Sequence, residues 1–267
     1  MPHKTIFALA LTMLLFISKT NADHVPGHAY FEWGIGLTAI TSPDYIGSSR
    51  QQSFLLPFPY LKYRGEILRV DDGIEGRLFK TPDLLLSISG NGSLPSPEDN
   101  PEREGMRKLD ATFEVGPALE YRISGNDNTE VWFELPLRFG FRANSDLNSI
   151  GYTSNPRVAW RKMAQGRYDW KLKLTSGFLF ADADFHGYFY NIAEDEVTTT
   201  RPRFTAQSGY SGWRTDFTFS RRFENLWFGG FFRYDDLHNS EIEQSPLVNR
   251  DHSITAGLSI AWIIGED

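Results

Sequence analysis

Residues 129 to 142 alternate strictly between large apolar side chains and polar or small ones. Because successive side chains of a strand point to opposite faces, this segment predicts a strand with one apolar and one charged face. The same alternation recurs along nearly the whole chain, as a membrane-spanning β-barrel with a polar interior requires. The apolar parity holds Val131, Phe133, Leu135, Leu137, Phe139 and Phe141, and the other holds Glu134, Pro136, Arg138, Gly140 and Arg142.

The first residues carry the pattern of a secretory leader. Residues 1–4 are positively charged, residues 5–17 are apolar apart from two threonines, and Thr20-Asn21-Ala22 offers small residues for cleavage. The apolar run is shorter than the ~20 residues of a spanning helix, and no later segment comes closer. We therefore expect residues 1–22 to be a signal peptide cleaved between Ala22 and Asp23, and residues 23–267 to form one outer-membrane β-barrel domain.

Composition narrows the classes of protein further. The chain has no cysteine, so neither a disulfide nor a lipid on an N-terminal cysteine can attach it to a membrane. The net charge of -7 becomes more negative when Lys4 and Lys19 leave with the leader, which argues against nucleic acid as a partner. The mean hydropathy of -0.37 is compatible with a barrel, because lipid-facing and lumen-facing residues average out.

The alternating runs predict an all-β fold, a transmembrane antiparallel barrel of about 12 strands. Bacterial barrels have an even number of strands, short periplasmic turns and long extracellular loops. If Asp72-Gly73 is a hairpin turn, the count is about 12 and every long connection falls on one rim. If residues 66–80 form one strand, the count is about ten and the rims become mixed, so ten is the fallback. The expected long loops are residues 41–51, 93–109, 143–152, 183–201 and 237–250.

A soluble sandwich or lipocalin-like barrel is the alternative fold, with its apolar face as the interior. Two features favour the membrane barrel. Charges occupy the minority face of long continuous ribbons, and aromatic residues fall near strand ends, where membrane girdles lie. The expected girdle residues are Trp33, Tyr60, Tyr63, Trp132, Trp160, Trp170, Trp227 and Trp262.

Charged residues of both signs share the inward parity and are expected to project into the lumen. A barrel of about eight strands leaves no channel and one of about 16 leaves a wide one, so this barrel lies between. Confined charges require compensation, which favours pairing that fills the interior, with a narrow conducting pore as the alternative. The expected lumen charges are Glu32, Glu114, Glu120, Glu134, Arg138, Arg142, Lys171, Lys173, Arg214, Asp216, Arg222 and Arg233.

Short motifs stand out against this alternation, and they span nearly all of the mature chain. They are Pro43-Asp44-Tyr45-Ile46-Gly47-Ser48, residues 57–66, residues 103–110, Val115-Gly116-Pro117, residues 134–138, residues 201–212 and residues 245–248. In their order and spacing these motifs resemble the MipA/OmpV family of outer-membrane proteins. One departure is the tail after Trp262, because such proteins commonly end on or near an aromatic residue.

The resemblance implies an outer-membrane barrel and, for some members, a scaffold that brings a murein lytic transglycosylase together with a murein synthase. Other members are described as porin-like or adhesive. The motif residues in loops are a candidate face for partner proteins or surface ligands, and turn chemistry alone is the alternative. These residues are Pro43, Asp44, Tyr45, Gly47, Arg103, Gly105, Met106 and Asp110.

Motifs of catalysis and metal binding are missing from the sequence. It contains no G-x-S-x-G, H-E-x-x-H or Walker loop. Asp251-His252-Ser253 has the residue types of a triad, but neighbours on a strand point to opposite faces. His24 and His28 alone fall short of a metal site, and a solvated loop explains Asp182, Asp184 and His186 equally well. We therefore expect no enzyme activity, no cofactor and no metal.

The sequence thus predicts a barrel of the Gram-negative outer membrane that contacts outer-membrane lipids. Its expected function is to anchor murein-remodelling proteins, a lytic transglycosylase and a murein synthase, at the periplasmic rim. A small porin that passes solutes through the charged lumen and a surface adhesin are the alternatives. An outer-membrane acyl hydrolase ranks behind them, because no suitable histidine and serine pair is recognisable.

Overall fold

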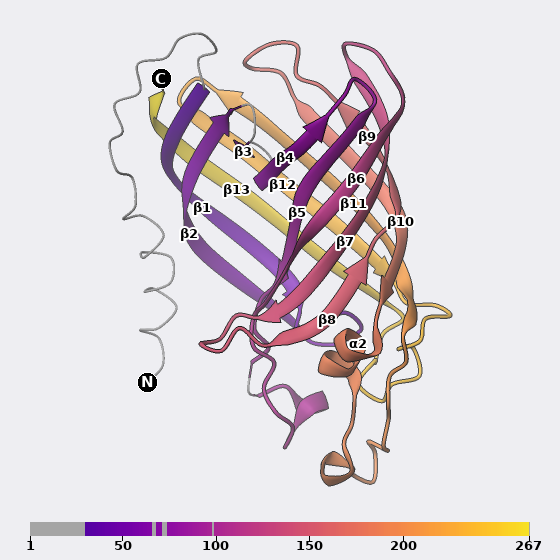
Figure 1. Ribbon diagram of the computed structural model, residues 1–267. Helices are drawn as coiled ribbons and strands as arrows, with labels where there is room; N and C mark the ends of the chain where they lie inside the picture. Colours follow the sequence, from indigo (N-terminus) through magenta and orange to yellow (C-terminus); the bar gives the residue numbers. More distant parts are fainter. Residues whose placement is uncertain (1–29, 66–67, 71–73, 98, 267) are drawn as a thin grey trace.

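The computed structural model describes residues 30–65, 68–70, 74–97 and 99–266 (Figure 1). The expected signal peptide, His24, His28 and the Asp72-Gly73 turn lie outside these residues. The strands are β1 (Tyr30–Pro43), β2 (Gln51–Arg64), β3 (Leu68–Val70), β4 (Ile74–Lys80), β5 (Leu84–Ser93), β6 (Thr112–Gly125), β7 (Thr129–Arg142), β8 (Ser149–Ser154), β9 (Arg157–Lys162), β10 (Lys171–Ala181), β11 (Gly209–Phe223), β12 (Leu226–Asp236) and β13 (His252–Glu266). The helices are η1 (Pro101–Arg103), α2 (Ala183–Tyr190) and η2 (Glu194–Glu196).

The strands form one antiparallel sheet that closes on itself. Each strand pairs with its neighbours in chain order, and the last strand, β13, pairs with the first, β1. β8 and β9 both lie between β7 and β10, so they are one wall strand interrupted at Asn155-Pro156. In the described part of the chain the ring therefore has 12 strands, which confirms the predicted barrel.

The connections divide between the two ends of the barrel. Short turns near residues 81–83, 126–128, 163–170 and 224–225 lie at one end, and the long connections lie at the other (Figure 1). Two predicted boundaries were wrong. β8 begins at Ser149, inside the expected 143–152 loop, and the expected 183–201 connection extends to residue 208, because β11 begins at Gly209.

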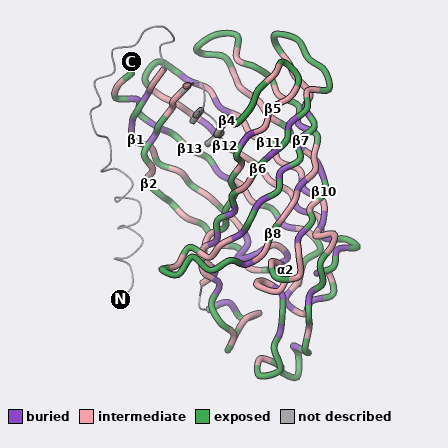
Figure 2. The backbone as a smooth tube through the Cα atoms, in the orientation of Figure 1, coloured by how far each residue is buried: buried purple, intermediate pink, exposed green. Residues whose placement is uncertain are grey.

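The apolar face of the wall points outward. On β7, Leu135 and Phe139 are more than 40% exposed, whereas Glu134 and Arg138 are buried. Figure 2 shows the same alternation of buried and exposed residues along the other strands. Among the described residues no helix is long and apolar enough to cross a membrane. The wall is therefore suited to face acyl chains on its outside and to hold polar groups inside.

The predicted aromatic girdle was wrong for part of its members. Trp33, Trp160 and Trp262 lie exposed on the outer face, but Tyr60 and Trp132 are buried on the inner face. The ring of Trp227 lies 5.6 Å from that of Tyr60, inside the barrel. The physical reason is the period of the strand, because Trp132 shares its parity with Glu134 and must point to the same side.

Candidate functional site: the loop cap and the charged lumen

The long connections fold into a separate apolar cluster, which we call the loop cap. It is built from residues 44–50, 94–97, 99–111, 182–208 and 237–251 at the long-loop end of the barrel (Figure 1). Met106, Tyr188, Phe189 and Phe204 pack around its core. The core consists of Tyr45, Leu109, Tyr190, Ile192, Ala206, Leu237, Ile242 and Leu247.

Glu102 fastens the second long connection to the first. Its carboxylate accepts hydrogen bonds from the Tyr45 hydroxyl at 2.6 Å, the Ser48 hydroxyl at 2.7 Å and the Ser49 backbone N–H at 2.9 Å. Burial raises the pKa of the Glu102 carboxyl, but the hydrogen bonds from Ser49, Tyr45 and Ser48 together lower the pKa below its usual value. Glu102 is therefore held as a carboxylate, and the motif loop 43–48 is shaped around it.

Asp44 is buried beside this fastening. Its Oδ2 accepts a hydrogen bond from Asn100 Nδ2 at 2.7 Å and lies 3.8 Å from Arg50 Nε. Its Oδ1 is buried without a hydrogen-bond partner among the described residues. Burial raises the pKa of the Asp44 carboxyl, and the Asn100 hydrogen bond opposes that shift only in part. Asp44 and Glu102 are thus neighbouring carboxyls with opposite pKa shifts.

Gly47 joins the first long connection to the last. Its φ of +89° is a conformation that favours glycine, and an added Cβ would lie 2.9 Å from Leu237 and 3.0 Å from Val248. Its N–H donates to the Ser253 hydroxyl at 2.8 Å. The His252 ring stacks on Tyr234, and its Nδ1 lies 2.6 Å from Oδ1 of its neighbour Asp251. The Asp251-His252-Ser253 segment is therefore a structural link and does not form a triad.

The motif at residues 103–110 contacts both the first connection and helix α2 within the cap. Arg103 Nη1 donates to the Phe189 carbonyl at 2.7 Å, and its guanidinium lies 5.7 Å from the centre of the Tyr45 ring. Gly105 has a φ of +76°, and the Asp110 N–H donates to the Tyr188 hydroxyl at 2.9 Å. The predicted motif residues thus come together in one folded unit.

Arg201 was not selected from the sequence, although it opens the 201–212 motif. Its guanidinium donates to the backbone carbonyls of Glu102 at 3.1 Å, Glu104 at 3.0 Å and Glu196 at 2.8 Å. It therefore ties the second connection to the fourth. No local pattern in the sequence reveals this role. The acceptors are backbone carbonyls, and two of the three lie about a hundred residues away from Arg201 in the chain.

The acidic segment at residues 182–186 forms the N-cap and the first turn of helix α2. Asp182 caps α2 by accepting from the Phe185 N–H at 2.9 Å. His186 is buried, with its two ring nitrogens 2.6 Å from the Gln207 carbonyl oxygen and from the Ser211 hydroxyl. Burial lowers the pKa of His186, so the ring is neutral. No group of three metal-binding side chains occurs among the described residues.

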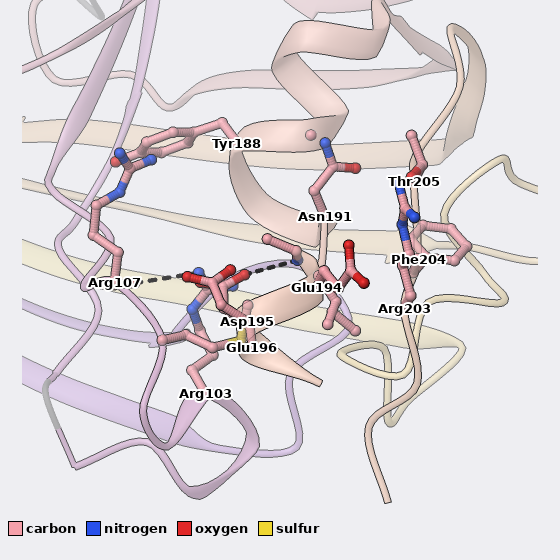
Figure 3. A pocket seen from close by; sticks show the side chains of 14 residues that line it. Arg103, Arg107, Tyr188, Asn191, Glu194, Asp195, Glu196, Arg203, Phe204 and Thr205 are labelled. Carbon is pink, nitrogen blue, oxygen red and sulfur yellow. Dashed lines mark hydrogen bonds between the residues drawn. The ribbon is translucent and has the colours of Figure 1, made fainter. Parts of the chain in front are cut away.

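A cleft of about 470 Å³ opens on the surface of the cap. Figure 3 shows Arg107 and Tyr188 on one side, Arg203 and Phe204 on the other, and the acidic residues 194–196 between them. Arginines and carboxylates balance one another here, so the cleft has mixed charge and no single preferred ligand charge.

The lumen contains networks of ion pairs, the first near the short-turn rim. Glu32 is fully buried, forms an ion pair with Arg222, accepts from the Tyr60 hydroxyl at 3.0 Å and lies 3.5 Å from Lys62 Nζ. Arg222 also lies 2.8 Å from Glu266. These contacts join β1, β2, β11 and β13 across the seam where the barrel closes.

A second network centres on Glu134. Its carboxylate contacts Arg157 at 2.6 Å, Lys173 at 2.9 Å and Arg161. Arg161 also lies 2.6 Å from Glu120. Arg157 and Arg161 were not predicted as lumen charges, although their alternation with Val158 and Trp160 follows the same inward parity.

The remaining predicted charges lie nearer to the loop cap or at strand ends. Asp216 pairs with Arg233 at 2.6 Å, and Arg214 pairs with Asp235 at 2.6 Å. Glu114 accepts from Asn91 at 2.8 Å and from Thr153 at 2.5 Å. The structure places Arg138 in the interior beside Ser89, and Arg142 and Lys171 half-buried at the ends of β7 and β10.

The chain was compared with solved structures, with curated protein sequences and with family models. Among solved structures, the chain is similar to a bacterial polysaccharide outer membrane secretin (10% identity over 91% of this chain and 100% of that chain, TM-score 0.42). It is also similar to an outer membrane channel from Pseudomonas putida F1 (12% identity over 93% of this chain and 100% of that chain, TM-score 0.42). A third similar structure is the outer membrane protease OmpT from Escherichia coli (9% identity over 88% of this chain and 96% of that chain, TM-score 0.32). No curated protein sequence matched the chain.

A family model described as "MltA-interacting protein MipA" matches residues 35–264. The match begins in β1 and ends in β13, so it covers the entire ring together with the loop cap. The chain therefore belongs to the MipA family of barrels in the Gram-negative outer membrane.

Proposed function

We propose that this protein is a non-enzymatic anchor, which holds a murein lytic transglycosylase and a murein synthase at its short-turn rim. The description of the family names an interaction with MltA, and this supports a protein partner. The observation that carries the proposal is an interior occupied by paired charges. Arg157 and Glu134 pair between adjacent strands, Arg222 of β11 pairs with Glu32 of β1 across two intervening strands, and the loop cap lies at the mouth of the barrel. Such an interior suits a rigid body more than a conduit.

The turn between β9 and β10 is the best docking surface on this rim. Met163 is 41% exposed and Tyr168 is 47% exposed, and aromatic and methionine side chains are enriched in protein interfaces. The turn is already ordered, because Asp169 accepts from the backbone N–H of Gln165 at 3.0 Å and of Gly166 at 2.8 Å. A surface fixed before binding loses little conformational entropy when the partner docks.

Photo-crosslinking in intact cells tests the anchor. A photoreactive residue at Gln165 or Asn126 is expected to capture a lytic transglycosylase from the periplasm. The matched control is the same residue at Asp146, an exposed position in the long connection at the opposite end. Recovery of only lipid and general assembly factors from Gln165 and Asn126 would remove the support for the anchor.

A small porin is the second candidate, because the inner wall carries charges of both signs along its length. Conductance of the refolded full chain in planar bilayers separates the two candidates. The anchor predicts no stable channels from the wild-type protein. Stable, ion-selective channels at neutral pH would favour the porin and contradict a filled lumen.

A further inference from the structure

The barrel wall is interrupted between β2 and β5. β2 pairs with β1 along its whole length, but within the described part of the chain it pairs with β3 only at Tyr63 and Arg64. Within the same residues, β5 pairs with β4 only as far as Ile88. Among the described residues, 51–62 of β2 and 89–93 of β5 thus have no strand beside their facing edges. In Figure 1, β2 and β5 diverge beyond β3 and β4, and β12 and β13 of the far wall are drawn behind them. We call this the β2/β5 gap.

The gap is bounded at both ends. At the short-turn end it stops at the β3 and β4 hairpin. At the long-loop end, Gln52 Nε2 donates to the Pro95 carbonyl at 3.2 Å, and Arg50 lies 2.9 Å from Asp99. Since long loops face outward in bacterial barrels, the gap opens in the half of the wall that faces the outer leaflet.

The edges of the gap are suited to remain unpaired. Pro57 and Pro59 share one parity of β2, and the register with β1 runs through both without a shift. A proline is tolerated in a strand where its nitrogen faces away from the paired neighbour, so both remove an N–H from the open edge. The β5 edge is polar, with the sequence Ser89-Gly90-Asn91-Gly92-Ser93. Unpaired backbone at membrane depth is tolerated where it lines a wet cavity, and this polar edge fits that condition.

Arg138 lies directly behind the β5 edge. Its Nε donates to the Ser89 hydroxyl at 3.0 Å, and its side chain is nearly fully buried. Ser89 pairs with Gly116 of β6. The flanking pairs Val115 with Phe139 and Ala118 with Pro136 put Gly116 level with Arg138 on β7, so the arginine reaches across a residue that has no side chain. A Cβ on Gly116 would lie 3.0 Å from Arg138 Cα, which leaves no room for a larger residue.

Arg138 differs from four other arginines of the lumen. Arg157, Arg161, Arg214 and Arg222 each contact a carboxylate, but no carboxylate of the described residues lies within 4.0 Å of Arg138. Glu114, the neighbouring acid, already accepts hydrogen bonds from Asn91 and Thr153. A buried guanidinium is costly unless an anion pairs with it. An anion that enters through the β2/β5 gap would supply that partner.

We propose that the β2/β5 gap binds a single-chain anionic amphiphile. Its headgroup pairs with Arg138 and Ser89, and its chain lies against the apolar β2 edge. Leu55 is 66% exposed on the outer face of that edge, and Leu56 is 36% exposed although it has the inward parity. A carboxylate or a phosphate makes strong charge-assisted hydrogen bonds to a guanidinium. This site is independent of the anchor at the short-turn rim and goes beyond it.

Competition binding tests the proposal on the purified full chain in phosphatidylcholine nanodiscs, with a fluorescent fatty acid as the reporter. Dodecanoate is expected to displace the reporter at least about tenfold more strongly than dodecanol, which lacks the charge. Arg138→Gln is expected to weaken dodecanoate binding by about tenfold or more. Arg142→Gln, a half-buried arginine on the same strand, is the matched control and should bind as the wild type does.

A second variant tests the gap itself without removing a charge. Gly90 lies on the outward parity of β5, and an added Cβ would meet only the Glu114 carbonyl oxygen at 3.6 Å, so Gly90→Leu adds side-chain bulk at the outer mouth of the gap. It should weaken dodecanoate binding, whereas Ala256→Leu on fully paired β13 should not. Equal binding by Arg138→Gln and the wild type, or equal displacement by dodecanol, would overturn the proposal. Equal displacement by phosphatidylglycerol would overturn its single-chain part.

Discussion

The barrel and the loop cap have opposite internal organisation. The barrel interior is ionic, with Glu32 and Glu134 buried among cations, and its apolar residues face outward. The cap interior is apolar, with Leu237 and Leu247 fully buried, and its charges are mostly at the surface. The medium outside each unit explains the difference. Acyl chains surround the wall, so the barrel buries its charged groups. Water surrounds the cap, so the cap buries its apolar groups.

The largest effect is expected from breaking the ionic interior. Glu134→Gln leaves Arg157, Arg161 and Lys173 without their shared carboxylate. Uncompensated buried charge should lower the free energy of unfolding by about 3–5 kcal/mol. Urea unfolding in detergent, followed by the heat-dependent shift in gel migration, measures this loss. Asp127→Asn, at an exposed turn next to β7, should change it little, and an equal loss in both variants would contradict the ionic-core description.

The apolar interior of the cap should respond locally. Leu247→Ala removes a fully buried side chain and should destabilise the cap by about 2–5 kcal/mol. We expect faster protease cleavage within residues 182–251, while the barrel keeps its urea midpoint. Leu147→Ala is the matched control, because Leu147 is 57% exposed in a neighbouring connection. If Leu247→Ala lowered the barrel midpoint as much as Glu134→Gln, the two units would have to be one cooperative core.

Substitutions at two glycines with positive φ allow the effect of packing to be distinguished from that of backbone strain within the cap. Gly105→Ala adds a Cβ with no atom within 4 Å, so only the strain of about 1–2 kcal/mol applies. Gly47→Ala adds the same strain and contacts with Leu237 and Val248 near 3 Å. Its cleavage rate should therefore rise more than that of Gly105→Ala. Equal rates would show that the first and last connections do not pack as described.

The smallest effect is expected from pH. Because the pKa of Glu102 is lowered in the folded cap, its carboxylate stabilises the cap above the ordinary glutamate pKa, and this stabilisation is lost as the pH falls through the lowered value. Glu102→Gln should cost about 1 kcal/mol near neutral pH, measured as faster cap cleavage. The difference from the wild type should shrink with acidification.

Asp44 supplies the control of opposite sign. Its pKa is raised by burial, so its charge destabilises the cap above that raised pKa and the penalty disappears as the pH falls. Asp44→Asn should therefore slow cap cleavage at neutral pH and have little effect in acid. Identical pH profiles for the Glu102→Gln and Asp44→Asn variants would contradict the opposite shifts.

The wall was predictable because its signal is local. The alternation at residues 129–142 predicted β7 to the residue, and connection lengths predicted which turns share a rim. The inner placement of Trp132 follows from the same alternation. The girdle prediction failed for this residue because it relied on the aromatic character of the side chain and ignored the two-residue period of the strand. The break at Asn155-Pro156 was missed because its two halves continue in line between the same neighbours.

The candidate sites were less predictable because they depend on distant contacts. Motif residues such as Tyr45 and Arg103 were selected, but nothing in the sequence shows that they meet residues near 190 and 247. Gly116 and Arg138 belong to two separate motifs, and only the register of β6 with β7 brings them level. The missing carboxylate beside Arg138 is likewise a property of three strands together.

The link between Gly47 and the last connection bears on how the protein is assembled. The Gly47 carbonyl accepts from the Asn249 N–H at 2.8 Å, so the cap joins chain segments that meet only after β1 has met β13. The complete cap therefore depends on closure of the barrel, because the pairing of β1 with β13 sets the first and the last connection side by side. In an open barrel, Leu237 and Leu247 would lack the part of their packing that the first connection supplies.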